Sequence, residues 1–202
     1  MQSTRTHDLE RLDLTRRSWL GHAGAGALAL SVPLLGRAAD ADSTFDETST
    51  LKAVTDFFGQ TTEGLAQVVA KVFQEQGRPN GYLRGEEVAA AVTAGVRYGE
   101  GELVMKSGAT RKVYWAGPSI GFDLGANASK VFVLVYKLED PDAIFKRFPG
   151  VDGSLYYVGG VGLNYQRADG VTLAPIRLGA ALRAGASVGY THYRREKSLN
   201  PL

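Results

Sequence analysis

Hydrophobic residues change their spacing once along the chain, near residue 79. Before that point they recur at intervals of three and four residues, at Leu65, Val68, Val69, Val72 and Phe73. This spacing predicts helical structure over 45–76, divided near Gly59, with Gly77 and Pro79 ending the second helix. The opposite face carries Glu63, Gln67, Lys71 and Gln74 without a basic bias. We therefore expect the apolar face to pack over a sheet, with a membrane-surface helix as the alternative.

Beyond residue 79 the period becomes two. Alternate apolar residues predict one long strand with a turn at 99–101, through Val88, Ala90, Val92, Ala94, Val96 and Tyr98. The turn begins a hairpin through Leu103 and Met105. Further strands are predicted at 111–116, 119–124, 131–136, 155–166, 171–178 and 180–193, with turns at 107–108 and 168–170. One short helix, 140–148, interrupts the strands, with Pro141 suited to its first turn.

Short turns between the strands favour an antiparallel sheet, because parallel strands need long crossover connections. Glycines of one parity share a face of each predicted strand, in the sets Gly95, Gly99 and Gly101, then Gly117, Gly121 and Gly125, then Gly179, Gly185 and Gly189. Glycine is typical of places where a sheet bends or approaches another backbone closely. We predict a mainly β fold: a small closed antiparallel barrel of about eight strands, with N-terminal helices and one inserted short helix.

The N-terminal segment has the pattern of an export signal. Arg16 and Arg17 precede an interrupted apolar run over 19–35, and 39–41 offers an Ala-x-Ala cleavage site. We therefore expect a twin-arginine signal peptide at 1–41, a helical segment at 42–78 and a β-barrel domain at 79–202, in a periplasmic protein that meets the twin-arginine export machinery. The alternative is an uncleaved amphipathic N-terminus in a cytoplasmic protein.

Composition narrows the chemistry of the mature chain. The sequence has no cysteine, so disulfides, thiolate nucleophiles and cysteine-ligated metals are excluded. His7 and His22 lie in the predicted signal, which leaves His192. A formal net charge of +2 gives no basic footprint for nucleic acid. No cofactor or metal is expected. Because the twin-arginine route exports folded proteins, its use here would then indicate that the domain folds early, before export, and not that it carries a cofactor.

Candidate catalytic residues are few. A Ser-His-Asp arrangement would need His192, which lies near the C-terminus beside two arginines. Carboxylates that could form an acid/base pair for glycan cleavage are Glu86, Glu87, Glu100, Glu102, Asp123 and Asp152. Most of these lie at predicted turns or strand starts, and 152–154 is typical of a turn with a local side-chain bond. Basic and aromatic residues at 190–197 are interpreted as a solvated tail, or as a contact to anionic headgroups.

Several blocks of the mature chain together resemble the EipA envelope-integrity family, a domain of unknown function. They are Phe45-Asp46, 56–59, 77–82, 85–87, 97–101, 115–121, 151–154 and 174–177. The resemblance implies a soluble periplasmic β-barrel of about eight strands, needed for envelope stress resistance and linked to surface polysaccharide and cell division, with no established catalytic residues. Through 97–101, 121–125 and 131–136 the chain is also distantly similar to SYLF lipid-binding domains.

The leading hypothesis is therefore a non-enzymatic periplasmic protein that supports envelope integrity by binding an envelope lipid, glycan or protein. The alternative is a glycan-modifying enzyme that uses two of the carboxylates. The content of the barrel interior would discriminate between these ligands. An apolar cavity would favour a lipid, whereas a filled core would favour recognition at the surface.

Overall fold

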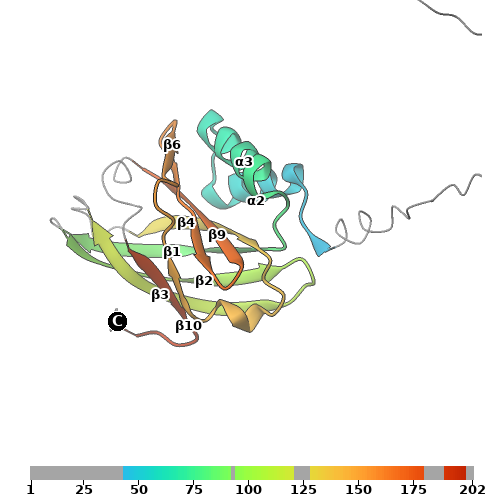
Figure 1. Ribbon diagram of the computed structural model, residues 1–202. Coiled ribbons are helices and arrows are strands. Elements are labelled where there is room, and N and C mark those ends of the chain that lie inside the picture. Colours follow the sequence, from blue (N-terminus) through green and yellow to red (C-terminus); the bar gives the residue numbers. More distant parts are fainter. Residues whose placement is uncertain (1–42, 92–93, 121–127, 180–188, 199–202) are drawn as a thin grey trace, which may run out of the picture. The chain divides into compact units, whose positions relative to one another are not determined.

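Two helices precede the strands of the sheet (Figure 1). The computed structural model describes residues 43–91, 94–120, 128–179 and 189–198, all within one compact unit. The Asp46 carboxylate accepts a hydrogen bond from Ser49 N (2.9 Å) and caps helix α2 (Glu47–Phe58). Thr62 caps α3 (Glu63–Gln76) in the same way. The predicted pair of N-terminal helices is confirmed. Neither described helix is long and apolar enough to cross a membrane.

Ten antiparallel strands form one sheet. Nine follow one another in the order β5-β10-β3-β2-β1-β4-β9-β7-β6, and β8 pairs with β9 beside them. The bounds of the strands are β1 (Gly81–Ala91), β2 (Ala94–Met105), β3 (Thr110–Ile120), β4 (Ser129–Tyr136), β5 (Arg147–Pro149), β6 (Tyr156–Val158), β7 (Val161–Leu163), β8 (Gln166–Ala168), β9 (Val171–Leu178) and β10 (Tyr190–Arg194).

The sheet is an open half-barrel, so the prediction of a closed barrel of about eight strands is wrong. Its path ends at β5 and β6, which do not pair with each other in the described sheet. The side of β5 meets the side of β8 through one isolated bridge, between Gly150 and Gln166. Strands β5 to β8 have three residues each, and such short strands cannot form the continuous ladder that closure requires.

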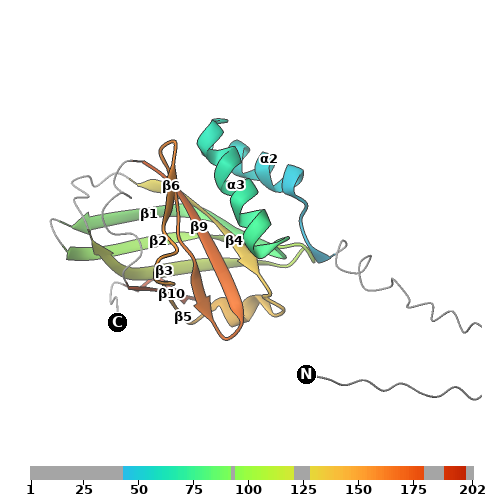
Figure 2. The ribbon, with the colours of Figure 1, turned by 45° about the horizontal axis from the view of Figure 1, so that its top comes forward.

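Both faces of the sheet bury apolar side chains because neighbouring residues of a strand point to opposite faces. On β4, Phe132 and Leu134 pack against the helices, which cover this outer face (Figure 2). Val131, Val133 and Val135 point to the inner face and pack with Leu83, Leu103, Val113, Leu173 and Phe148. The helices therefore pack over the sheet as predicted, and the inner face contains a filled apolar core.

The predicted long strand over 88–98 is wrong, because β1 ends at Ala91 and β2 begins at Ala94, with Ala91 opposite Gly95. Gly99 and Gly101 lie inside β2 instead of in a turn. A Cβ atom at Gly101 would lie 2.4 Å from Arg84 O, and one at Gly99 would lie 2.1 Å from Trp115 Cε2. Gly101 permits the close backbone approach that the shared parity predicted, whereas Gly99 makes room for the indole, which was not predicted.

Two other predicted elements also differ from the structure. The strand expected at 155–166 is a hairpin, β6–β7, whose turn residues Gly159 and Gly160 have φ values of 55° and 81°, followed by β8. The helix expected at 140–148 is a 3-10 turn, η1 (Pro141–Ile144), because the buried Phe148 belongs to β5 and packs on Tyr193.

The turns expected at 107–108 and 168–170 are confirmed. Strand β3 joins the first predicted strand at 111–116 to residues 119–120 of the next. Residues 121–127 and 180–188 lie outside the described residues, so the remainder of two predicted strands, with Gly121, Gly125 and Gly185, stays untested.

Candidate functional site

Three charged side chains are buried on the inner face of the sheet. Glu87 of β1, Arg97 of β2 and Arg177 of β9 are 6%, 8% and 5% exposed. We call them, together with Trp115 and Asn164, the buried charge cluster. Glu87, Arg97 and Arg177 point to the inner face because each continues the alternation of inward-facing residues on its strand. They lie beyond the apolar core, toward one end of this face.

The Glu87 carboxylate has partners at both oxygens. Arg177 Nε donates to Oε1 (2.6 Å) and Arg177 Nη2 to Oε2 (3.3 Å), while Trp115 Nε1 donates to Oε2 (3.1 Å). Arg177 Nη1 also donates to Asn164 (3.4 Å). Burial raises the pKa of Glu87, but the charges of Arg177 and Arg97 and the hydrogen bonds outweigh it and hold the pKa below its ordinary value. The carboxylate therefore stays ionised.

Two arginines share this one carboxylate, so the cluster has an excess positive charge. Beside it, Gln166 donates to Thr191 Oγ1 (2.9 Å) and Tyr193 OH donates to Gln166 Oε1 (3.3 Å). Burial raises the pKa of Tyr193, so its hydroxyl remains a neutral donor. These bonds join β8 and β10 across the inner face next to the cluster.

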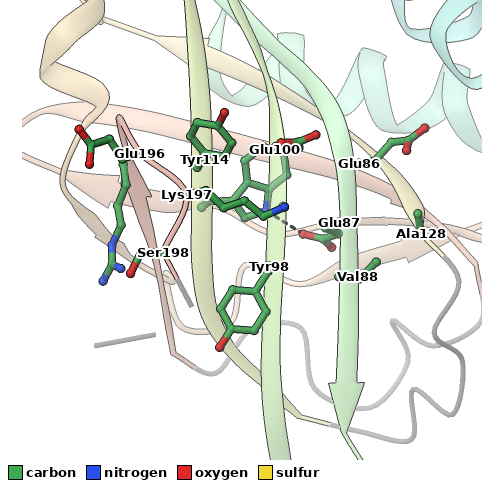
Figure 3. A pocket seen from close by; sticks show the side chains of 13 residues that line it. Glu86, Glu87, Val88, Tyr98, Glu100, Tyr114, Ala128, Glu196, Lys197 and Ser198 are labelled. Atoms are coloured by element: carbon green, nitrogen blue, oxygen red, sulfur yellow. Dashed lines mark hydrogen bonds between the residues drawn. The ribbon is translucent and has the colours of Figure 1, made fainter. Parts of the chain in front are cut away.

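A pocket of about 230 Å³ lies over the middle strands β1, β2 and β3 (Figure 3). Its exposed carboxylates on the sheet are Glu86 and Glu100, which are register partners across β1 and β2, and the buried Glu87 also lines it. Its aromatic lining is Tyr98, Tyr114 and Trp115. We call this set the aromatic–carboxylate pocket. Arg194, Glu196, Lys197 and Ser198, from β10 and the segment after it, border it.

The structure describes five of the six predicted carboxylates. It brings Glu86 and Glu100 together in the pocket, and Glu100 also forms an ion pair with Lys112 (3.7 Å). Glu102 pairs with Arg84 (2.9 Å). Glu87 belongs to the buried charge cluster and also reaches the pocket lining. Asp152 lies in the exposed turn, where the local bond joins Ser154 Oγ to Val151 O (2.6 Å).

Asp123 lies outside the described residues. His192 accepts a hydrogen bond at Nδ1 from Arg194 Nε (3.1 Å). Burial lowers the pKa of His192, and so do the charges of Arg194 and Arg147. These charged neighbours are cations, whereas a catalytic triad needs a carboxylate beside the histidine. Among the described residues, no three His, Cys, Asp or Glu side chains gather as metal ligands would.

Sequence reasoning gave no role to Arg97, Arg177 or Trp115. A signal was present, because Arg97 is a charged residue on the strand face whose next positions are Gly95 and Gly99. Only the pairing of β1 with β4, and of β4 with β9, brings Glu87 near Arg177. That pairing order could not be obtained from hydrophobic spacing.

The comparisons with known proteins agree with this architecture. The family model described as envelope integrity protein A matches residues 43–202. A crystal structure of a β-barrel-like, uncharacterised protein from Brucella abortus is similar, with 39% sequence identity, a TM-score of 0.74, and coverage of 79% of this chain and 99% of that chain. No curated protein matches the chain. Because the family model spans every described residue, this chain belongs to the envelope integrity protein A family.

Proposed function

We propose that this protein supports the integrity of the cell envelope without catalysis, by binding an envelope glycan in the aromatic–carboxylate pocket. The observation that carries the proposal is the lining of this pocket, where the rings of Tyr98 and Tyr114 lie among the carboxylates of Glu86 and Glu100. Aromatic rings offer flat amphipathic surfaces to the C–H faces of a sugar, and carboxylates accept hydrogen bonds from hydroxyl groups. Family membership supports the role in the envelope.

The packed inner face supports a sugar over a lipid chain as the ligand. Leu83, Leu103 and Val113 are fully buried there, together with Val133 and Leu173. An acyl chain needs an apolar cavity, and these side chains fill the apolar part of the half-barrel with one another. Recognition at the surface pocket then remains as the binding mode.

The enzymatic alternative has one observation in its favour. Glu86 and Glu100 face each other in register, which places their Cβ atoms about 4.5–5.5 Å apart. A glycosidase, however, needs one carboxyl group whose raised pKa keeps it protonated as the acid. Both glutamates are exposed, and Lys112 lies beside Glu100. The buried candidate, Glu87, has a lowered pKa and is held ionised by Arg177. We therefore favour binding over cleavage.

We further propose that residues 1–41 are a twin-arginine signal peptide, that the helical segment 42–78 and the β domain 79–202 form the mature protein, and that this protein works in the periplasm. The start of the family match at residue 43 supports a boundary there. The closely packed sheet and helices also suit a domain that folds before export.

The test is a binding assay on residues 42–202 with three probes: soluble peptidoglycan fragments, purified surface polysaccharide, and phosphatidylglycerol vesicles. We expect saturable binding to at least one glycan and none to the vesicles, with at least a tenfold loss of affinity in Tyr98→Ala and Tyr114→Ala. Tyr157→Ala, on the β6–β7 hairpin, is the control and should bind normally. Binding to vesicles alone, or to no probe, would contradict the proposal.

The same variants test the enzymatic alternative in cells. Glu86→Gln and Glu100→Gln keep the shape of the side chains and one acceptor oxygen each, but remove their charge and their acid/base chemistry. We expect cells that carry either variant to keep at least half of the wild-type survival under detergent stress, and cells with Tyr114→Ala to lose it. Complete loss of survival with both glutamine variants, together with normal glycan binding, would favour an enzyme.

A further inference from the structure

Arg97 is a buried cation with one hydrogen-bond donor, Nε, left without a partner within the described part of the chain. Its side chain is 8% exposed, and its Nε has no hydrogen-bond partner. Burying a guanidinium donor without a hydrogen-bond partner is costly, because the donor loses its hydration and the protein does not replace it. Such a group requires a physical explanation.

Glu87 does not supply the missing partner. Its oxygen Oε1 accepts from Arg177 Nε, and Oε2 accepts from Arg177 Nη2 and Trp115 Nε1. Glu87 attracts Arg97 at longer range, but Arg177 repels it. Burial and this repulsion lower the pKa of Arg97, so its surroundings disfavour its charge. One carboxylate against two guanidinium groups leaves one positive charge in excess.

Arg97 lies among glycines on the inner face. Gly95 and Gly99 are the next positions on the same face of β2, and Gly117 is its register partner on β3. The ring of Trp115 fills the space beside Gly99, and the backbone of Tyr190 fills the space beside Gly117. Arg97 also lies three residues from the start of β2 at Ala94, close to one end of the strand.

We propose that Arg97 is the anchor of an oxyanion-binding site on the inner face of the half-barrel, which takes a carboxylate or phosphate group. An incoming oxyanion would accept from the unpartnered Nε and neutralise the excess charge, with the planar guanidinium fork suited to two parallel hydrogen bonds. The neighbouring ion pair between Arg177 and Glu87 would stay in place.

Arg97 points to the opposite face of β2 from Tyr98 and Glu100, although Glu87 and Trp115 belong to the cluster and also line the aromatic–carboxylate pocket. Replacing Arg97 leaves Tyr98 and Tyr114 unchanged, so the anion test and the glycan test can fail separately.

The test measures the melting temperature of residues 42–202 against rising concentrations of inorganic phosphate, glycerol 3-phosphate and glucuronate, at constant ionic strength set with sodium chloride. A ligand that binds only the folded protein raises the melting temperature in a saturable way. We expect a rise of several degrees with at least one of the three. Selective response to glycerol 3-phosphate would identify a headgroup-like source, and selective response to glucuronate an acidic sugar.

Arg97→Met should abolish this rise, and its melting temperature without anion should equal or exceed that of the wild type, because the unpaired charge is gone. Arg84→Met, on the outer face of β1, is the control and should keep the rise. Arg97→Lys keeps the charge without the fork and should bind the anion at least tenfold more weakly. No response of the wild type, an undiminished rise in Arg97→Met, or wild-type affinity in Arg97→Lys would overturn the proposal.

Discussion

At the scale of single residues, the inner face depends on glycines that make room for one indole. A Cβ atom at Gly85 would lie 2.8 Å from Trp115 Cη2, and one at Gly99 would lie 2.1 Å from Cε2. The same indole donates to Glu87, so its position also sets the geometry of the buried charge cluster. A change that displaces the Trp115 ring is therefore expected to disturb the ion pair between Glu87 and Arg177 as well.

Gly99→Ala should lower the free energy of unfolding by about 1–3 kcal/mol, because a rigid ring and two paired strands leave no room for a methyl group. Chemical denaturation of the purified domain measures this loss. In a Trp115→Phe background the smaller ring should relieve part of the clash, so the cost of Gly99→Ala should fall by at least about 0.5 kcal/mol. An equal cost in both backgrounds would mean that the indole does not occupy this space.

Glu87→Gln should lower the free energy of unfolding by about 3–5 kcal/mol, because it leaves two buried arginines without an anion. Glu86→Gln, one residue away and exposed, is the matched control and should change it by less than about 0.5 kcal/mol. Denaturation at pH 7 compares the two variants. Similar losses in both would show that the buried position of Glu87 gives it no special importance.

The ion pair also predicts a pH dependence. The pKa of Glu87 in the folded protein lies below its ordinary value of 4.5. The carboxylate therefore contributes stability that is complete above that value and is lost as the pH falls through the folded pKa. Unfolding experiments from pH 7 to pH 3 should show a steeper acid loss in the wild type than in Glu87→Gln. Parallel curves would contradict the assignment.

At the scale of elements, α3 contacts the β6–β7 hairpin through its first turn. A Cβ atom at Gly64 would lie 2.7 Å from Val158 O and 3.0 Å from Gly159 O. Leu65, Val68 and Val72 of the same helix are fully buried over the sheet. The glycine therefore sets how closely the helix approaches the hairpin.

Gly64→Ala should destabilise the protein by about 1–2 kcal/mol, although alanine favours a helix over glycine by about 1 kcal/mol, because the backbone of the hairpin cannot move aside cheaply. Gln67→Ala, an exposed change on the same helix, should stay within about 0.5 kcal/mol of the wild type. Thermal unfolding measures both. A stabilised Gly64→Ala protein would show that the helix is not tightly docked.

Elements with strong local signals could be predicted from the sequence, and elements fixed by distant contacts could not. The helix over 63–76 has a capping threonine, an apolar face and a terminal glycine, all of them local. Gly99 and Gly101 suggested a turn, but β1 and Trp115 from other strands decide their conformation. The pocket was partly predicted, since Glu86 and Glu100 were candidates, whereas Tyr98 and Tyr114 join them only through the register of β1, β2 and β3.

At the scale of the whole molecule, the paired arginines of the N-terminal segment predict the route of export. Replacement of Arg16 and Arg17 by lysine should trap the precursor inside the cell, because the twin-arginine route reads the paired guanidinium groups. Cell fractionation followed by immunoblotting measures the exported share. Lysine at 5 or 11, in place of arginine outside the pair, is the control. Efficient export of the double variant would show that another route suffices.

Glycan recognition in the aromatic–carboxylate pocket is the central claim, and one spectroscopic titration tests it directly. The sequence has 2 tryptophans, Trp19 and Trp115, so residues 42–202 contain Trp115 alone, in the lining of the pocket. Titration with purified surface polysaccharide or peptidoglycan fragments should produce a saturable change in tryptophan fluorescence that Tyr114→Ala weakens at least tenfold. Binding of these glycans without any change in the Trp115 signal, or with unchanged affinity in Tyr114→Ala, would contradict the claim.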